Sequence, residues 1–282
     1  MTRCPLHILK AGVCYHPAAM ARRGASFCPA EFPSLVGLIL HPTEGAILFD
    51  TGYDPAFFTA TEAIPERFYR WITPVKLPDG AAAADQLARF GLTPTDIRAV
   101  IVSHFHGDHV AGLHAFTRAR IFCSRFGMAE VMRPGRFARV RRGVLASLAP
   151  PDMPQRATFF EDLPFAPLGA DLAPFDVGAD LFGDGSLLAI NLPGHCPGHW
   201  GLALRGEDDR RTFLIGDAAW SRGAVRDNVP PPRLTTSLLG DTATYRQTLL
   251  NLNQLWTRNT DIVLTPSHCP DAASDAHAGH EH

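Results

Sequence analysis

Short apolar runs alternate with turn residues and with helix-like segments along the chain, and this pattern predicts an α/β fold. The apolar runs are short and rich in β-branched residues, which is typical of buried strands. They cover residues 35–40, 46–50, 99–103, 187–190, 212–215 and 261–264. Apolar residues at helical spacing predict three helices. These cover residues 81–90, 108–116 and 242–256.

Two long stretches show neither the short apolar runs of strands nor the apolar spacing of helices. Residues 53–80 are rich in aromatic side chains, and residues 133–180 combine many prolines with an early group of arginines. Long irregular segments in a compact domain often form lids or binding loops. The aromatic stretch is interpreted as a substrate wall or a dimer contact, or else as packing beneath a loop. The arginines either attract an anionic substrate or form a solvated helix face.

Composition limits the classes of function. A chain of 282 residues can bury one large core or two small ones. We expect a single domain over residues 1–270 with a disordered, histidine-containing tail over 271–282. The formal net charge of −2 disfavours a nucleic-acid partner, and no apolar window is long enough to predict a membrane span. Without an apolar leader pattern, the six cysteines are expected to be reduced and the protein cytoplasmic.

The candidate chemistry begins in residues 104–109, which read His-Phe-His-Gly-Asp-His. Imidazole and carboxylate groups are ligands for zinc and its first-row neighbours. The segment directly follows a predicted strand, so His104 and His106 can converge on one ion if the backbone stays extended. Asp108 and His109 lie beyond a glycine and can turn toward a second point. The spacing therefore suggests two adjacent metal sites.

Three later segments repeat the order strand, turn, ligand. His195 lies in Pro-Gly-His-Cys-Pro-Gly-His, Asp217 follows a glycine, and His268 follows Pro-Ser. Together with the first cluster, these residues would stand at the ends of four strands and share one edge of a sheet sandwich. His199 repeats the Gly-His pair and is interpreted as a supporting or structural histidine. Cys196 is interpreted as a small buried residue.

The ordered set just described resembles the binuclear metallo-β-lactamase superfamily. Asp50-Thr51-Gly52, at the end of an early apolar strand, is similar to that family's Asp-Thr-Gly. Within the family, the chain looks most like the N-acyl-homoserine lactonases, judged from residues 6–12, 33–40 and 193–199. The resemblance implies a four-layer αββα sandwich with two mixed β-sheets and a binuclear metal site at one edge.

The same resemblance implies a role for each candidate residue. One ion would take His104, His106 and His195, the second would take Asp108, His109 and His268, and Asp217 would bridge them. The two divalent ions are expected to be zinc, although manganese, cobalt and iron accept the same ligands.

A hydroxide acidified by the two ions would attack a lactone or ester carbonyl. Asp108 would be the catalytic group that passes a proton to the leaving alkoxide. Asp50 is a candidate to fix a ligand imidazole by accepting its other N–H.

One position departs from the lactonase pattern. Those enzymes usually carry a tyrosine three positions after the bridging aspartate, where this chain has Trp220. An indole either places an N–H donor at a different distance from the substrate than a tyrosine hydroxyl would, or contributes only its volume. The substrate is expected to be a small-molecule lactone or ester, and Trp220 predicts that it binds in an altered pose. The same departure favours a related ester, a bulkier lactone or a phosphotriester.

Other functions of the same fold stay open. A thioesterase of the glyoxalase II type is disfavoured because only 65 residues follow Asp217. β-Lactamases are generally exported, and the common zinc classes lack the full Asp-His pair with the bridging aspartate. Flavin-linked diiron enzymes carry glutamate where His106 stands, and a nuclease would be more basic. A phosphotriesterase or arylesterase, a non-catalytic metal-binding protein, and a homodimer as the assembly are not excluded.

Overall fold

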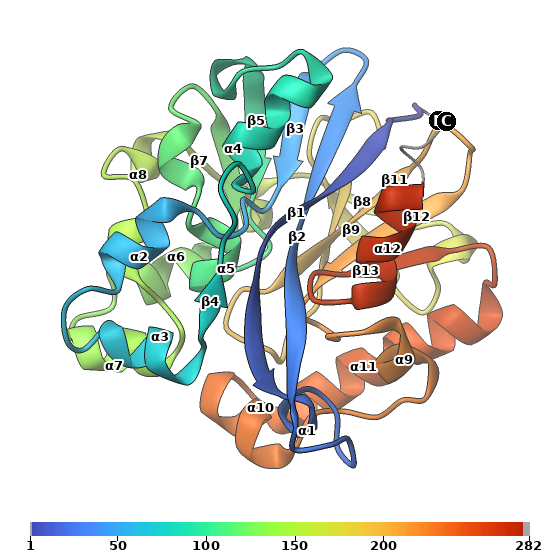
Figure 1. The fold of residues 1–282 in the computed structure, drawn as a ribbon. Helices are drawn as coiled ribbons and strands as arrows, with labels where there is room; N and C mark the ends of the chain where they lie inside the picture. Colours follow the sequence, from blue (N-terminus) through green and yellow to red (C-terminus); the bar gives the residue numbers. More distant parts are fainter. Residues whose placement is uncertain (1, 279–282) are drawn as a thin grey trace.

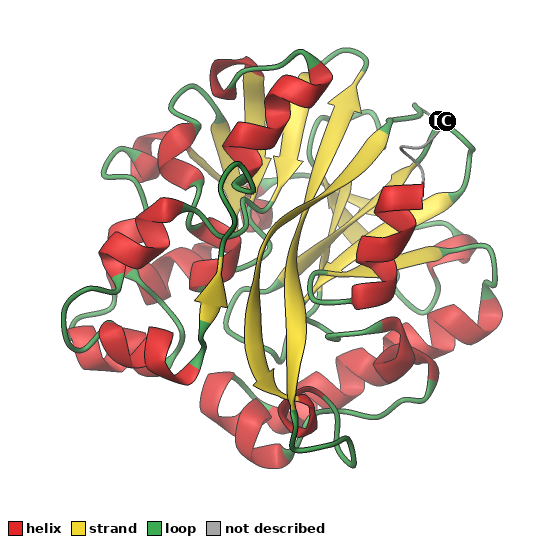
Figure 2. Ribbon diagram, viewed as in Figure 1, coloured by secondary structure: helices red, strands yellow, loops and turns green. Residues whose placement is uncertain are grey.

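The computed structural model describes residues 2–278 and places two β-sheets face to face, with helices on both outer sides (Figure 1; Figure 2). The first sheet contains, in spatial order, β4 (Val75–Lys76), β1 (Leu6–Pro17), β2 (Pro29–His41), β3 (Gly45–Phe49), β5 (Ile97–Ile101), β6 (Arg120–Cys123) and β7 (Ala157–Phe159). The second contains β13 (Val263–Pro266), β12 (Arg211–Gly216), β11 (Trp200–Arg205), β10 (Leu188–Asn191), β9 (Val177–Asp180) and β8 (Phe165–Pro167).

Both sheets are mixed. In the first, β1 pairs antiparallel with β2 and β4, and β2 with β3, whereas β3, β5, β6 and β7 run parallel. In the second, the only parallel pair among the described strands is β12 with β13. The αββα sandwich and all six predicted strands are confirmed, with boundaries shifted by one or two residues except at the start of β2, which begins six residues earlier than predicted.

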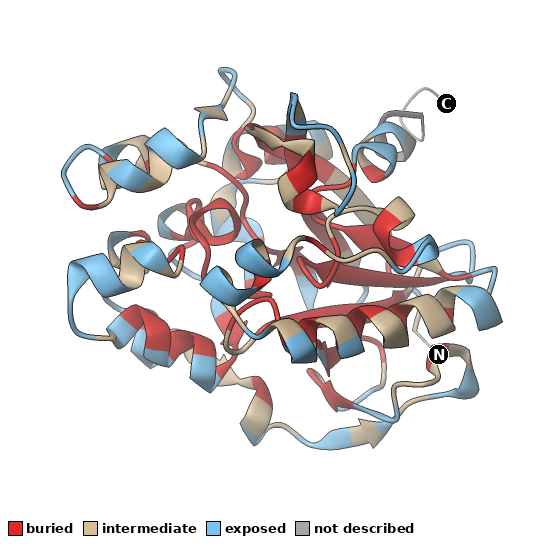
Figure 3. Cartoon of the chain, turned by 90° about the horizontal axis from the view of Figure 1, so that it is seen from below, coloured by how far each residue is buried: buried red, intermediate tan, exposed pale blue. Residues whose placement is uncertain are grey.

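Strand alternation separates the core into layers. Ile47 and Phe49 of β3 lie between the sheets, whereas Leu48 points to the outer helices of the first sheet. On the second sheet, Phe213 of β12 packs outward with Leu249, while Leu214 faces the first sheet. Successive side chains of a strand point to opposite faces, so both faces of each sheet are covered. Figure 3 shows the buried strands at the centre and exposed outer helix faces.

The helices are short apart from α11. They are α1 (Ala18–Ala21), α2 (Pro55–Ala60), α3 (Arg67–Ile72), α4 (Ala83–Gln86), α5 (Gly107–Val110), α6 (Arg125–Met132), α7 (Arg136–Arg141), α8 (Met153–Arg156), α9 (Arg222–Arg226), α10 (Arg233–Leu239), α11 (Thr242–Arg258) and α12 (Pro270–Ala278). Short 3₁₀ helices are η1 (Leu87–Phe90), η2 (Pro94–Asp96), η3 (Leu113–Ala115), η4 (Ala146–Leu148), η5 (Phe160–Asp162) and η6 (Ala170–Leu172). None of the described helices is long and apolar enough to cross a membrane.

The helix predicted over residues 108–116 is interrupted, and the cause is Thr51. Its amide and hydroxyl both donate to the His109 carbonyl, at 2.8 and 3.0 Å, and its hydroxyl accepts from the Gly112 amide at 3.1 Å. These bonds replace the next helical ones, so the chain forms α5 and then η3. Asp108 and His109 are thereby held against the end of β3.

The prediction of a disordered tail is wrong for residues 271–278, which belong to α12. Ala272 packs with Leu35 of β2 and with Cys269, so small side chains let this helix lie close to the first sheet. The remaining predicted tail, residues 279–282, lies outside the described residues. The two irregular stretches also contain short helices and strands, among them α3 and α7.

Three of the early arginines of the second irregular stretch are ion-paired. Arg136 of α7 binds Glu66, with Nη2–Oε2 at 2.6 Å. Arg133 and Arg142 both lie against Glu130, at 2.6 and 3.5 Å. Because these guanidinium groups already have carboxylate partners, their arrangement favours a structural role over attraction of an anionic substrate.

Candidate metal centre

The predicted ligand segments meet at one edge of the sandwich. His104 and His106 follow β5, and Asp108 and His109 lie on α5. The other three residues follow β10, β12 and β13 of the second sheet. The two sheets are joined at this edge by the Trp200 amide, which donates to the Ser103 carbonyl at 2.9 Å.

The parallel pair β12–β13 brings Asp217 and His268 together. Gly216 is in register with Pro266, and the Ser267 amide donates to the Gly216 carbonyl at 3.0 Å. Gly216 has a φ of +53°, which favours glycine. A Cβ atom there would lie 2.7 Å from His199 Nε2, so the absence of a side chain also leaves room for that ring.

Three imidazoles and one carboxylate oxygen form a first donor cluster. His106 Nδ1 lies 3.0 Å from both His104 Nε2 and His195 Nε2. Asp217 Oδ2 completes the cluster, 3.2 Å from His195 Nε2 and 3.9 Å from His104 Nε2. All four side chains are buried.

A second cluster lies beside the first and shares the same carboxylate. His268 Nε2 lies 3.2 Å from Asp108 Oδ2 and 3.2 Å from Asp217 Oδ1. His109 Nε2 lies 3.7 and 3.4 Å from the same two oxygens. The two oxygens of Asp217 therefore face different clusters, and the structure brings together all seven predicted ligands.

The donors fit divalent cations. His109 Nε2 and Asp217 Oδ1 are buried and have no hydrogen-bond partner among the described residues. Leaving such atoms unsatisfied costs about 1–3 kcal/mol each. Neutral imidazole nitrogens and carboxylate oxygens converging within a few ångströms are the donor set that zinc prefers. Two cations, one in each cluster, would satisfy these atoms.

Charge distribution at the centre supports the same interpretation. Burial alone would raise the pKa of Asp217, but the imidazoles of His268, His109 and His195 hold it well below its ordinary value. Burial would lower the pKa of His109, but Asp108, Asp217 and Asp50 raise it to about 10. The pKa of His268 is raised in the same way. Without metal, protons on His109 and His268 therefore balance the carboxylates, and metal binding must displace them.

Buried acceptors orient three of the imidazoles. Asp50 Oδ2 accepts from His109 Nδ1 at 2.8 Å, and the Asp50 carboxylate also accepts from the amide and hydroxyl of Ser103. The Ser103 hydroxyl lies 3.0 Å from His104 Nδ1, and His268 Nδ1 donates to the Pro33 carbonyl at 2.7 Å. With Nδ1 engaged, Nε2 of each ring is left to face the clusters. Asp50 thus lies where the sequence placed it.

His199 supports the bridging carboxylate. Its Nδ1 donates to the Leu192 carbonyl at 3.0 Å, and its Nε2 accepts from the Asp217 amide at 2.9 Å. Both ring nitrogens are occupied, so His199 cannot serve as a ligand in this geometry. Its position agrees with the supporting role expected from the sequence.

Cys196 is buried beside the donors, as expected of a small buried residue near the site. Its thiol is within 4.8 Å of the donor atoms of His104, His106 and His195. Burial raises the pKa of this thiol well above its ordinary value. The group is therefore protonated in the metal-free centre and does not compete with the imidazoles there.

Trp220 covers the centre from the side of the second sheet. Its ring centroid lies 5.9 Å from that of His268, 6.5 Å from that of His195 and 5.8 Å from that of Phe32. The indole Nε1 is buried and has no partner among the described residues. Position 220 thus contributes an aromatic wall to the site but no hydroxyl group.

The sequence analysis did not single out Tyr69. This residue of α3 places its hydroxyl 3.4 Å from Asp108 Oδ1, and its ring packs edge-on against Phe57 with centroids 5.5 Å apart. Burial, together with the nearby Asp108 carboxylate, raises the pKa of Tyr69 well above its ordinary value. No local motif marked it, because a separation of 39 residues is closed only by tertiary packing.

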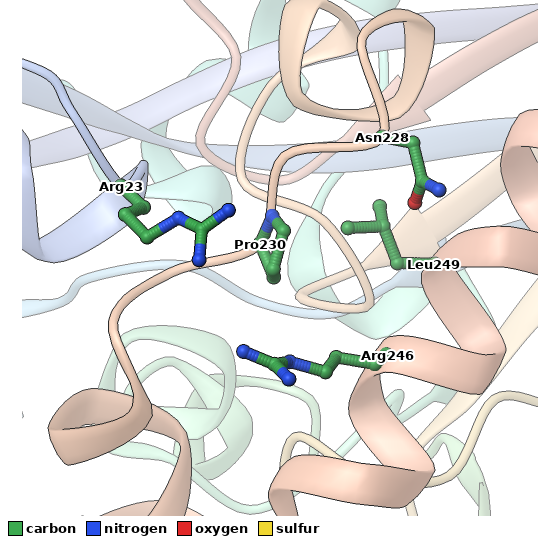
Figure 4. Close-up of a pocket in the computed structure, with 5 residues that line it drawn as sticks. All are labelled: Arg23, Asn228, Pro230, Arg246 and Leu249. Carbon is green, nitrogen blue, oxygen red and sulfur yellow. The ribbon is translucent and has the colours of Figure 1, made fainter.

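A cavity of about 220 Å³ lies apart from these donors and is lined by Arg23, Asn228, Pro230, Arg246 and Leu249. Figure 4 shows the guanidinium groups of Arg23 and Arg246 near Pro230. None of the seven predicted ligands lines this cavity.

Comparison with known proteins identifies the family. The model of the metallo-beta-lactamase superfamily matches residues 29–268. The chain belongs to the metallo-beta-lactamase superfamily. Among curated members, N-acyl homoserine lactonase AttM of Agrobacterium fabrum is 27% identical, over 96% of this chain and 95% of its own. N-acyl homoserine lactonase AiiB of the same organism is 24% identical, over 77% and 72%.

Solved structures of this superfamily share the fold. An AiiA variant from B. thuringiensis, with N-decanoyl-L-homoserine bound at its active site, superposes with a TM-score of 0.75 at 19% identity, covering 98% of this chain and 97% of that one. AidC, described as a dizinc quorum-quenching lactonase in complex with a product, gives 0.62 at 15% identity, covering 96% and 89%. The predicted family and fold are thus confirmed.

Proposed function

We propose that this protein is a binuclear metal-dependent hydrolase that opens N-acyl-homoserine lactones, and so quenches quorum signals. The observation that carries the proposal is the shared Asp217 carboxylate, whose two oxygens face two buried donor clusters. The lactonase names of the curated relatives support the choice of substrate. We propose zinc as the metal, since AidC is described as a dizinc enzyme.

In this proposal, His104, His106 and His195 would hold one ion and Asp108, His109 and His268 would hold the other. Asp217 would contribute one carboxylate oxygen to each donor cluster. Such a pair of cations supplies an acidified water and polarises the substrate carbonyl. Asp50 keeps His109 in the tautomer that presents Nε2, and His199 fixes the backbone of Asp217.

Asp108 is the proposed proton carrier. Its Oδ2 faces His109 and His268, so Oδ1 lies on the other side of the carboxylate, toward Tyr69. Water adds to the lactone carbonyl carbon, the ring C–O bond breaks, and a proton is delivered to the departing alkoxide. The product is the ring-opened N-acyl-homoserine.

Ring-opening of a panel of N-acyl-homoserine lactones, followed by proton release from metal-replete protein, tests this function. Asp108→Asn is the control, because it removes the proton carrier while keeping the shape of the side chain. Turnover that the substitution abolishes is the expected result. The absence of turnover across the panel would refute the lactonase proposal.

If the lactones are not opened, aryl esters are the next substrates to test, because Trp220 provides an aromatic wall. Phosphotriesters and thioesters follow. The expected cytoplasmic location, the single domain over residues 1–270 and the homodimer stay predictions.

A further inference from the structure

The resemblance to the lactonases leads to the expectation of a tyrosine at position 220, where this chain has an aromatic ring and no hydroxyl. Trp220 cannot supply an O–H donor, and its buried indole N–H has no partner among the described residues. A developing oxyanion is stabilised by donors already aimed at it. Another side chain must therefore donate the hydrogen bond to the oxyanion that a tyrosine at position 220 would have donated.

Tyr69 reaches the same centre from helix α3. Its hydroxyl is 3.4 Å from Asp108 Oδ1, longer than the about 2.5–3.0 Å of an ordinary O–H···O bond. The proton of this hydroxyl is therefore only weakly held by the carboxylate. A substrate oxygen near Asp108 can attract it by rotation about the C–O bond alone.

The surrounding contacts hold Tyr69 in place. Its ring packs edge-on against Phe57, which packs edge-on against Tyr53 with centroids 5.1 Å apart. At the start of α3, Glu66 is bound by Arg136 of α7 through two hydrogen bonds, at 3.0 and 2.6 Å. The helix that carries Tyr69 is thereby tied to a neighbouring helix, so the hydroxyl is placed before substrate binds.

We propose that Tyr69 is a catalytic residue of this chain, which donates a hydrogen bond to the reacting ester group of the substrate and replaces the hydroxyl missing at position 220. The proposal rests on the proposed lactone hydrolysis. On substrate binding, the Tyr69 hydroxyl redirects its hydrogen bond from Asp108 Oδ1 to the carbonyl oxygen, whose negative charge grows as water adds. Asp108 Oδ1 becomes free to hold the proton of that water.

Tyr69→Phe tests the donor directly. We expect kcat to fall about 100-fold with KM changed less than about threefold, as for loss of one oxyanion donor. Metal content and thermal midpoint should stay at the wild-type values, since Phe keeps the packing against Phe57. Tyr53→Phe is the matched control, because it removes another hydroxyl from the same aromatic group and should leave kcat unchanged.

A rescue experiment separates a chemical role from a structural one. Trp220→Tyr introduced into the Tyr69→Phe protein should restore most of kcat, whereas Trp220→Phe in the same background should not. If the variant that combines Tyr69→Phe with Trp220→Tyr is no faster than Tyr69→Phe alone, Tyr69 does not replace a hydroxyl at position 220. Equal kcat in wild type and Tyr69→Phe would overturn the proposal as a whole.

Product binding distinguishes failure of this proposal from failure of the proposed function. Calorimetry with N-hexanoyl-L-homoserine and metal-loaded protein needs no turnover. We expect about tenfold weaker binding to Tyr69→Phe, because a hydrogen bond to a charged group is lost. A wild type that binds the product without opening the lactone refutes only the proposed function. Equal product affinity of the two proteins refutes the role of Tyr69.

Discussion

Gly143 controls the position of His106, and Gly143→Ala should empty one of the two proposed metal sites without touching a ligand. Gly143 has a φ of +74°, and a Cβ atom there would lie 2.7 Å from His106 Cδ2. Carbon atoms in contact lie about 3.5–4.0 Å apart, so the ring has to move by roughly 0.8 Å or more. Metal–ligand distances tolerate only about 0.2 Å.

Gly143→Ala should have two separate effects, one on the stability of the fold and one on metal affinity. The left-handed backbone costs an alanine about 1–2 kcal/mol, which lowers stability but not metal affinity. Displacement of His106 removes one donor of the first cluster, and we expect about 100-fold weaker binding of that ion. The second cluster contains neither residue and should keep its ion.

Gly80→Ala is the control that measures only the cost of placing an alanine at a positive φ. Gly80 has the same φ of +74°, but no atom lies within 4 Å of its added Cβ. After dialysis against a weak chelator, mass spectrometry should find two ions per chain in wild type and Gly80→Ala, and one in Gly143→Ala. The thermal midpoint of both metal-free variants should fall by a few degrees. Two firmly held ions in Gly143→Ala would refute the reasoning.

Three further predictions concern the same centre. Asp217→Asn should bind fewer than two ions per chain, because one bridging oxygen becomes an amide nitrogen; normal binuclear loading in a metal analysis would contradict the bridge. Asp50→Asn should weaken metal binding by about 10–100-fold in chelator competition, since His109 loses a charged acceptor; an unchanged affinity would exclude that role. The pKa of His109, raised to about 10 in the metal-free protein, gives stability that is complete below pH 6.5 and disappears as pH approaches 10. The thermal midpoint of metal-free protein should therefore fall over this range, and a flat profile would contradict the ion pairing of His109.

Much of the centre was predictable because its information is local. Each ligand follows a short apolar run, and strand ends that meet at one edge of a sandwich bring such residues together. His104 and His106 show this, as does Asp217 directly after β12. The order of ligands along the chain was also specific enough to indicate the family before any geometry was known.

The remaining features depend on tertiary contacts that no local pattern records. Thr51 interrupts the helix after Asp108 through hydrogen bonds to residues far along the chain. Tyr69 reaches Asp108 only because its helix packs beside the first sheet. The segment that begins α12 resembled a small, polar tail in sequence, because Ala272 and Ala273 contribute through close packing near Leu35 rather than through a large apolar surface.

The hydrogen bond from His268 to the Pro33 carbonyl joins positions 235 residues apart. Contacts of such long separation form late, because a large loop must close before they contribute any stabilisation. A growing chain therefore has no complete second cluster until its last strand has emerged and paired with β12. Both ions can therefore bind with full affinity only after folding is complete. Hydrolytic activity should appear at the end of folding rather than during it.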